Sequence, residues 1–272
     1  MNAPICATCG TQFPPQAGLP DTCPICDDER QYVGSQGQQW TSLSTLQAER
    51  RNRIEDHEPK LTGIGTEPKF GIGQRALLVQ TPQGNVLWDC ITLIDDATIQ
   101  AVRALGGISA IAISHPHYYS CMVEWSQAFG GVPIHLHAAD REHVVRPDPA
   151  IVFWEGDTQA LPGGLTIIRC GGHFAGSAVL HWPAGAQGRG ALLTGDSIQV
   201  VQDRRWVSFM RSYPNLIPLP ARAVQHIVDS VEPYAYDRIY GAWWETVVAH
   251  DAGQAVRASA ERYMRALEGT GF

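Results

Sequence analysis

The sequence lacks the features of a membrane-spanning, exported or nucleic-acid-binding protein. It holds no run of roughly 18 or more apolar residues, so we expect no membrane-spanning helix and no membrane partner. Its first residues lack a basic region followed by an apolar stretch, so we expect no secretion signal and a cytoplasmic location. The chain also has fewer basic than acidic residues, with 20 Lys and Arg against 27 Asp and Glu. The formal net charge of -7 would repel a phosphate backbone, so we expect no nucleic-acid partner.

A complete set of disulfides is also disfavoured, because the chain has seven cysteines. Four of them form two short pairs near the start, Cys6-x-x-Cys9 and Cys23-x-x-Cys26. Two such knuckles can place four thiolates tetrahedrally around one Zn2+ ion, and such a closed site is structural because it has no position for substrate. Four free or disulfide-linked cysteines, or a rubredoxin-like iron site, are the alternatives. The unit, residues 1–35, resembles a zinc ribbon.

The 272 residues are enough for one large domain and a small appendage. We expect a four-cysteine unit at 1–35, a polar connector at 36–61 that is partly helical, and the main domain at 62–272. Apolar runs of strand length predict strands at 75–80, 85–89, 108–114, 132–136, 165–170, 178–182, 191–194 and 239–240. Amphipathic stretches predict helices at 97–105, 121–129, 138–144, 221–231 and 252–267.

Metal-type side chains follow three of these strands. One strand ends at His115-Pro116-His117, and side chains two residues apart on an extended segment point the same way. A second strand ends in two glycines before His173, and a third ends before Asp196. Any one of these residues alone is more often structural. Three strands that end in nitrogen and oxygen ligands together indicate a catalytic metal site.

These motifs, in this order and spacing, resemble the metallo-β-lactamase superfamily over roughly residues 62–250. The resemblance rests on Ser-His115-Pro-His117, Gly-Gly-His173-Phe-Ala-Gly-Ser177, Leu-Leu-Thr-Gly-Asp196-Ser and, upstream, Val86-Leu87-Trp88-Asp89. It implies an α/β (α+β) fold: an αββα sandwich of two mixed sheets with outer helices and the metals at one edge. The small N-terminal zinc ribbon would be added to it.

The sequence departs from the family at the ligands of the second metal. Tyr119 and Ser120 stand where the family motif has an aspartate and a histidine. The last family histidine is also missing from the segment 239–244, although His250 nearby could replace it. Because His115, His117, His173 and Asp196 are all present, we expect one catalytic metal rather than two.

A single ion can lower the pKa of bound water, and the resulting hydroxide would attack an ester, thioester, lactone, amide or heterocumulene. We predict Zn2+ at this site, with Fe2+ as the alternative metal. Tyr118 or Tyr119 could donate a hydrogen bond to the developing oxyanion, or could simply pack beneath the metal loop. We therefore expect a zinc hydrolase that acts on a small-molecule substrate, and that can pair as a homodimer, as superfamily members often do.

Two other functions fit the same residues. Two histidines and an aspartate can hold Fe(II) in a mononuclear oxygenase, as in persulfide dioxygenases that resemble this superfamily. Loss of the second site could instead mark a non-catalytic binding protein. The number of aromatic residues favours a small, largely apolar substrate; the candidates for the pocket wall are Trp154, Phe174, Trp206, Tyr213, Trp243 and Trp244. We interpret the other histidines as structural or surface residues: His57, His135, His137, His143, His181 and His226.

Overall fold

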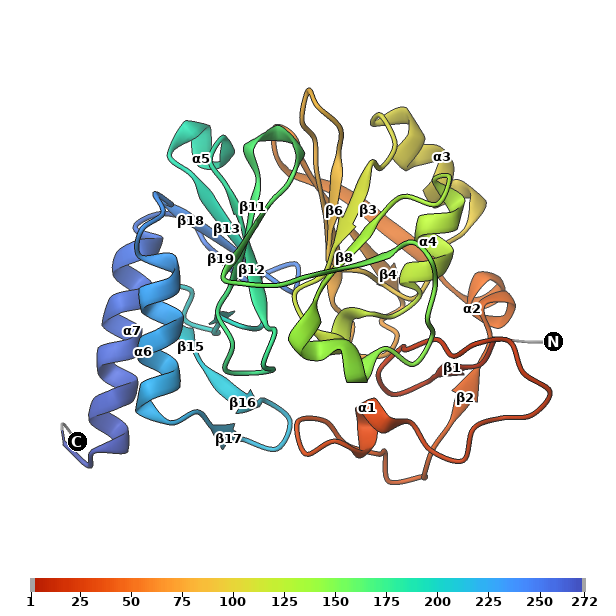
Figure 1. Ribbon diagram of the computed structural model, residues 1–272, viewed down its shortest axis with the longest axis horizontal. Helices are drawn as coiled ribbons and strands as arrows, with labels where there is room; N and C mark the ends of the chain where they lie inside the picture. Colours follow the sequence, from red (N-terminus) through yellow and green to blue (C-terminus); the bar gives the residue numbers. More distant parts are fainter. Residues whose placement is uncertain (1–2, 271–272) are drawn as a thin grey trace.

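The computed structural model describes residues 3–270, and its main part consists of two sheets packed face to face with helices outside both. Figure 1 shows α3 (Asp96–Ala104) and α4 (Met122–Ala128) outside one sheet, and α6 (Ala221–Val231) and α7 (Ala252–Leu267) outside the other. The predicted αββα sandwich is confirmed. Among the described residues, no helix is both long and apolar enough to cross a membrane.

The first sheet has seven strands in sequence order. They are β3 (Arg51–Glu58), β4 (Leu61–Glu67), β5 (Arg75–Val79), β6 (Val86–Trp88), β7 (Ala110–Ala112), β8 (Ile134–His137) and β9 (Ile151–Trp154). The strands from β3 to β6 pair antiparallel, whereas those from β6 to β9 pair parallel. The parallel part is covered by α3 and α4, which explains why β7 is a continuous apolar run rather than an alternating one.

The second sheet has six strands, in the order β10-β11-β12-β13-β18-β19. Their bounds are β10 (Thr158–Ala160), β11 (Thr166–Arg169), β12 (Ala178–Trp182), β13 (Ala191–Gly195), β18 (Arg238–Gly241) and β19 (Val247–Val248). The β13–β18 pair is parallel, with α6 in the connection between the two strands. Apolar side chains of both sheets, such as Trp88 and Leu193, form the core between the sheets.

The helices outside the second sheet bury one apolar stripe each. Val224, Ile227, Val228 and Val231 of α6 recur at helical spacing and are all buried. Each such side chain contributes about 1.5–3 kcal/mol when it leaves water completely. The expected bounds of α6 and α7 agree with the structure, because amphipathic periodicity is the strongest signal in a sequence.

Residues 36–61 differ from the connector that we expected. They contain the expected short helix, α2 (Leu43–Glu49), whose N-cap Ser42 accepts a hydrogen bond from Thr45 N. They also contain β3, which pairs with β4 along its whole length and forms the edge of the first sheet. We missed β3 because its sequence is mostly charged, and charged side chains are typical of an edge strand that faces water. In place of the α-helix expected at 138–144, Ala138–His143 forms a 3₁₀ segment with a kink at Asp140.

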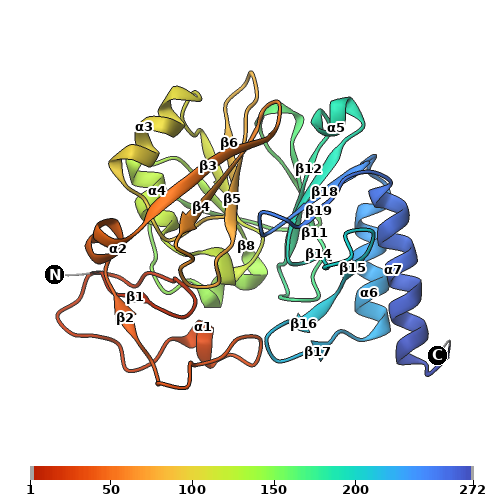
Figure 2. The same cartoon turned by 180° about the vertical axis from the view of Figure 1, so that it is seen from behind.

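The four-cysteine unit packs against one end of the sandwich. It contains β1 (Ile5–Cys6) and α1 (Pro24–Asp27), and β1 pairs with β2 (Trp40–Thr41) of the following stretch. In Figure 1 this unit lies next to β16 (Met210–Ser212) and β17 (Ile217–Pro218), and Figure 2 shows the same neighbours from behind. These two strands form a hairpin that follows β14 (Gln199–Val200) and β15 (Val207–Ser208).

Candidate metal centre

The first two candidate ligands follow β7. Asp89, directly after β6, has φ 60° and accepts a 2.7 Å hydrogen bond from Ser114 N at Oδ1. This bond fixes the chain where it leaves β7. His115 is extended at this point, with φ -170° and ψ 170°.

His117 does not continue the strand as we expected. It lies in a 3₁₀ turn, Pro116–Tyr118, because the fixed φ of proline suits the first position of a helical turn. The turn, rather than the alternation of a strand, brings His117 beside His115, with their ring centroids 5.2 Å apart.

Glycines allow His173 and Asp196 to approach the two histidines that follow β7. Gly171 and Gly172 before His173 have φ of 63° and 81°, a region that other residues rarely adopt. Gly195 before Asp196 has φ 55°, and a Cβ there would lie 2.7 Å from Ser114 Oγ. Only a glycine lets the end of β13 pass this close to the end of β7.

The structure brings all four predicted ligands together. His115, His117, His173 and Asp196 are buried, and each offers one ligand atom within 4.8 Å of the others. His115 Nε2 lies 3.0 Å from Asp196 Oδ1, and His173 Nε2 lies 3.2 Å from His117 Nδ1 and 4.0 Å from Asp196 Oδ1. Ligand atoms about 2.0–2.1 Å from a tetrahedral zinc ion would be about 3.3 Å apart. The donor set and its spacing therefore fit a metal ion.

Hydrogen bonds orient two of the imidazoles. His115 Nδ1 lies 2.9 Å from Ser114 Oγ, and His173 Nδ1 lies 3.1 Å from Met210 O. Each contact occupies the Nδ1 side of the ring and leaves Nε2 facing the common centre. Within residues 3–270, His115 Nε2 and Asp196 Oδ1 have no hydrogen-bond partner, although both are buried. Buried polar atoms without partners are rare, and a shared cation would satisfy both.

Burial adjusts the charges of these groups. It lowers the pKa of His115 and His117 well below the usual range and lowers the pKa of His173 to about 4. It raises the pKa of Asp196 to about 7. The imidazoles are therefore neutral near pH 7, and a neutral imidazole is the form that binds a metal.

A cavity of about 250 Å³ opens beside the four ligands. His117, His173 and Asp196 line it, together with Gln31, Ile72, Gln199, Tyr213, Pro214 and Trp243. Two of the six aromatic residues that we predicted for the pocket wall are thus found there, Tyr213 and Trp243. Phe174 packs behind the histidines instead, with ring centroids 4.9 Å from His117 and 5.1 Å from His173.

The other three aromatic candidates lie elsewhere. Trp154 packs on His137 in the core between the sheets, and Trp206 stacks under Arg262 on the surface. Trp244 packs against His57. None of the three lines the cavity.

The two tyrosines after His117 lie in different surroundings. Tyr118 is fully buried, and its ring centroid lies 4.4 Å from that of His115. Its hydroxyl has no hydrogen-bond partner among the described residues, and its role as a donor stays a prediction. Tyr119 lines a separate small cavity with Gln12 and Arg146, so this geometry gives no support to a catalytic role for it. His250 is exposed and contacts Asp251 at the start of α7, outside the group of four ligands.

The predicted cysteine cluster also forms. The Sγ atoms of Cys6 and Cys26 are 3.6 Å apart, those of Cys9 and Cys23 are 3.7 Å apart, and all four lie within 4.8 Å of one another. Thiolates about 2.3 Å from a tetrahedral zinc ion would be about 3.8 Å apart. None of the cysteines forms a disulfide. The cluster therefore fits a second metal ion.

Sequence reasoning missed the polar residues of the cavity wall, Gln31 and Gln199. Gln31 belongs to the four-cysteine unit, where no periodic pattern marks it. Its position depends on how the unit docks on the main domain. Gln199 lies in β14, and its buried Oε1 has no hydrogen-bond partner in the part of the chain that the structure describes.

Similarity to a known relative extends over nearly the whole chain. No family model matches the chain. A relative in Bacillus subtilis (strain 168), the uncharacterised protein YmaE, is 50% identical over 265 residues, which cover 97% of this chain and 96% of YmaE.

Solved structures of metallo-β-lactamases are similar in fold. The DIM-1 enzyme has a TM-score of 0.57 and 14% identity, over 79% of this chain and 99% of that one. The enzyme from Pontibacter korlensis has a TM-score of 0.55 and 17% identity, over 78% and 99%. At these identities the likeness shows the fold alone. The chain thus belongs to the same family as YmaE, and it has the metallo-β-lactamase fold with an added N-terminal four-cysteine cluster.

Proposed function

We propose that this protein is a metal-dependent hydrolase with one catalytic ion, which acts on a small, largely apolar substrate. One observation carries the proposal: four buried ligand atoms converge beside a cavity that three of the four residues line. The substrate class is an ester, thioester, lactone, amide or heterocumulene. A divalent ion in this place would supply Lewis-acid chemistry and lower the pKa of water.

The residues around the cavity favour a small apolar group. Ile72, Pro214 and Trp243 offer apolar surface, and about 250 Å³ is less than the roughly 300–1,000 Å³ of sites for drug-sized ligands. The unpaired Oε1 of Gln199 would accept a hydrogen bond from a substrate N–H or O–H.

The surroundings of Ser120 support a single catalytic ion. The Oγ of Ser120 accepts a hydrogen bond from Gln74 Nε2, and its carbonyl oxygen accepts one from Gln12 N. Ser120 thus contacts both the main domain and the four-cysteine unit at a position where the family motif has a metal ligand. No further histidine, cysteine or carboxylate of residues 3–270 joins the group of four.

Element-resolved metal analysis of the purified protein, followed by a hydrolase panel, tests the proposal. We expect zinc at both clusters and hydrolysis of at least one small ester, thioester, lactone or amide. His117→Ala should abolish this activity, whereas the matched control His226→Ala, on the exposed face of α6, should leave it unchanged.

Two results would overturn the proposal. Stoichiometric iron at the histidine cluster after anaerobic purification, with oxygen uptake, would establish the oxygenase instead. Equal background activity in wild type and His117→Ala across the panel would favour a binding protein without catalysis.

A further inference from the structure

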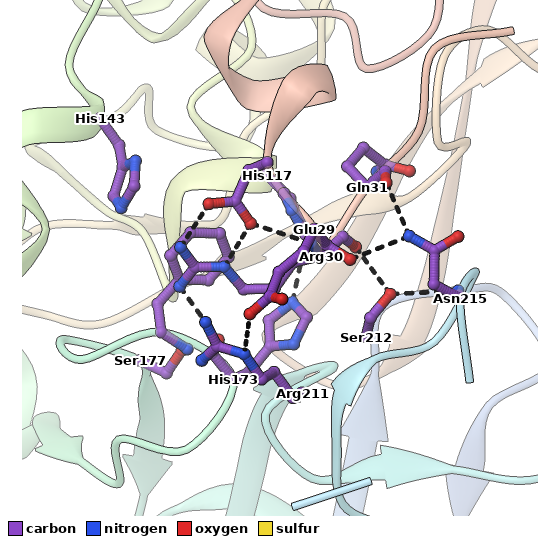
Figure 3. Close-up of polar contacts among 12 residues, drawn as sticks. Glu29, Arg30, Gln31, His117, His143, His173, Ser177, Arg211, Ser212 and Asn215 are labelled. Carbon is purple, nitrogen blue, oxygen red and sulfur yellow. Dashed lines mark hydrogen bonds and ion pairs between the residues drawn. The ribbon is translucent and has the colours of Figure 1, made fainter. Parts of the chain in front are cut away.

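A short segment of the four-cysteine unit reaches the histidine centre. Residues 28–31 follow α1 and lie between the histidines and the β16–β17 hairpin, where Figure 3 shows Glu29, Arg30 and Gln31. The segment contains Arg30, the one arginine within residues 1–35. Hydrogen bonds fix this segment both to the loop of His173 and to the hairpin.

Arg30 contacts the loop that carries His173. Its guanidinium forms a two-pronged ion pair with Asp28, with Nε–Oδ1 and Nη2–Oδ2 distances of 2.6 Å each. The guanidinium carbon lies 3.8 Å from the centroid of the Phe174 ring, which packs against His117 and His173. Nη1 also donates to His173 O at 3.4 Å. The Arg30 side chain is only 11% exposed, so its ion pair with Asp28 is shielded from water and holds the guanidinium in one position.

The other side of the segment is fixed by the hairpin. Ser212 Oγ donates to Arg30 O at 3.1 Å, and Asn215 Nδ2 donates to Glu29 O at 2.9 Å and to Gln31 O at 2.8 Å. The same hairpin provides Met210 O, the partner of His173 Nδ1. The hairpin therefore holds both a candidate ligand and the segment that covers it.

Gln31 connects this segment to the cavity. Its backbone is held by Asn215, and its buried side chain lines the cavity beside His117 and His173. A residue of the cysteine unit is thus part of the wall that a substrate would touch.

We propose that the four-cysteine unit completes the histidine centre, with Arg30 as a positioning residue for His173 and Phe174 and Gln31 as a substrate-contacting residue. The inference rests on the proposed function in one respect, that the histidine cluster holds a metal. The planar guanidinium both stacks on Phe174 and bonds to Asp28, which an ammonium group cannot reproduce. Loss of these contacts leaves the loop of His173 less well ordered for its ion.

Cobalt(II) titration of the metal-free full-length protein tests this role. Thiolate-to-cobalt charge transfer reports the cysteine cluster, and the visible bands of an imidazole–carboxylate site report the histidine cluster. We expect Arg30→Ala to weaken cobalt binding at the histidine cluster about 10–100-fold, the usual effect of removing a group that supports a metal ligand. The thiolate band should stay at wild-type intensity, which shows that the cysteine unit remains folded. Arg30→Lys should restore part of the affinity.

Arg205→Ala is the matched control. Arg205 forms the same two-pronged pair with an aspartate two residues before it, Asp203, at 2.9 and 2.7 Å. Its side chain, however, is 83% exposed and lies outside the cavity. We expect wild-type cobalt affinity at both clusters in this variant.

The double variant Cys23→Ser/Cys26→Ser tests the link between the two clusters. Once its thiolate band is lost, we expect weaker cobalt binding at the histidine cluster as well, because the anchor of residues 28–31 is gone. Wild-type affinity of the histidine cluster in Arg30→Ala, or in the double variant, would overturn the inference and leave the proposed function intact. Absence of the imidazole–cobalt bands in the wild type would overturn both.

Discussion

The two candidate metal clusters of this protein are built in opposite ways. The cysteine cluster comes from residues 6–26, on two tight turns close together in the chain. The histidine cluster comes from residues between 115 and 196, on segments that follow three different strands. A local cluster needs only turn geometry to form. A dispersed cluster needs the two sheets to be packed correctly first.

The clusters also differ in what surrounds them. Four sulfur ligands complete a tetrahedral zinc site and leave no position for substrate. The histidine cluster borders a cavity, and three of its four residues line that cavity. This difference favours the proposal that the first cluster is structural and the second catalytic, and the following experiments test it.

The largest effect is expected from His173→Ala. This change removes one of three imidazoles, so we expect loss of the metal at the histidine cluster and a drop in kcat/KM greater than the roughly 10–100-fold that follows removal of a supporting group. Metal content and steady-state kinetics measure both. The control is His135→Ala on β8, which lies outside the cluster and should keep both properties. Full activity without the ion would contradict a catalytic role for this site.

Cys23→Ser should affect metal content more than catalytic activity. We expect loss of the ion at the cysteine cluster, cleavage of residues 1–35 by protease, and retention of the ion at the histidine cluster when metal is saturating. Metal analysis and limited proteolysis check this. Cys170→Ser, at a buried thiol outside the cluster, should change neither. Unchanged metal content in Cys23→Ser would exclude a metal at the four cysteines.

A smaller effect is expected from Gln31→Ala, which alters the wall of the cavity without touching a ligand. Loss of about one hydrogen bond to the substrate corresponds to roughly a fivefold rise in KM, with kcat little changed. Kinetics on the best substrate of the panel measure the change. Gln36→Ala, in an exposed turn just after the unit, is the control. A fall in kcat with unchanged KM would contradict a role for Gln31 in substrate binding.

The last prediction concerns stability rather than activity and involves Asp140, which supports the loop of His173. Its Oδ1 accepts a 2.7 Å hydrogen bond from Gly176 N, and burial raises its pKa to about 6. The folded state therefore binds a proton that the unfolded chain, with a pKa near 3.9, releases. The resulting stability is present below about pH 4 and is lost as pH rises through 6.

Asp140→Asn keeps the acceptor and removes the charge. We expect the variant to be more stable than wild type at pH 8, by at most about 3 kcal/mol, and equal to it near pH 4. Denaturant unfolding at the two pH values checks this. Asp229→Asn, at an exposed position on α6, is the control. Equal effects of Asp140→Asn at both pH values would contradict the raised pKa.

Much of the histidine cluster could be predicted because apolar runs end abruptly at its residues. His115 and Asp196 follow strands whose burial is visible in the sequence, and the glycines before His173 mark a sharp turn. The conformation at His117 could not be predicted, since proline at 116 can either end a strand or begin a helical turn. The edge strand β3 was missed because its charged side chains give no apolar alternation.

The two sets of candidate ligands could be recognised without a structure, because the spacing between cysteines and the ends of buried strands are local properties. What covers the histidine cluster depends instead on contacts between distant parts of the chain. Arg30 meets Phe174, and Gln31 enters the cavity, through hydrogen bonds to residues more than a hundred positions away, such as Ser212 and Asn215. Contacts of that kind depend on how two folded units dock, and no local pattern in the sequence predicts the docking.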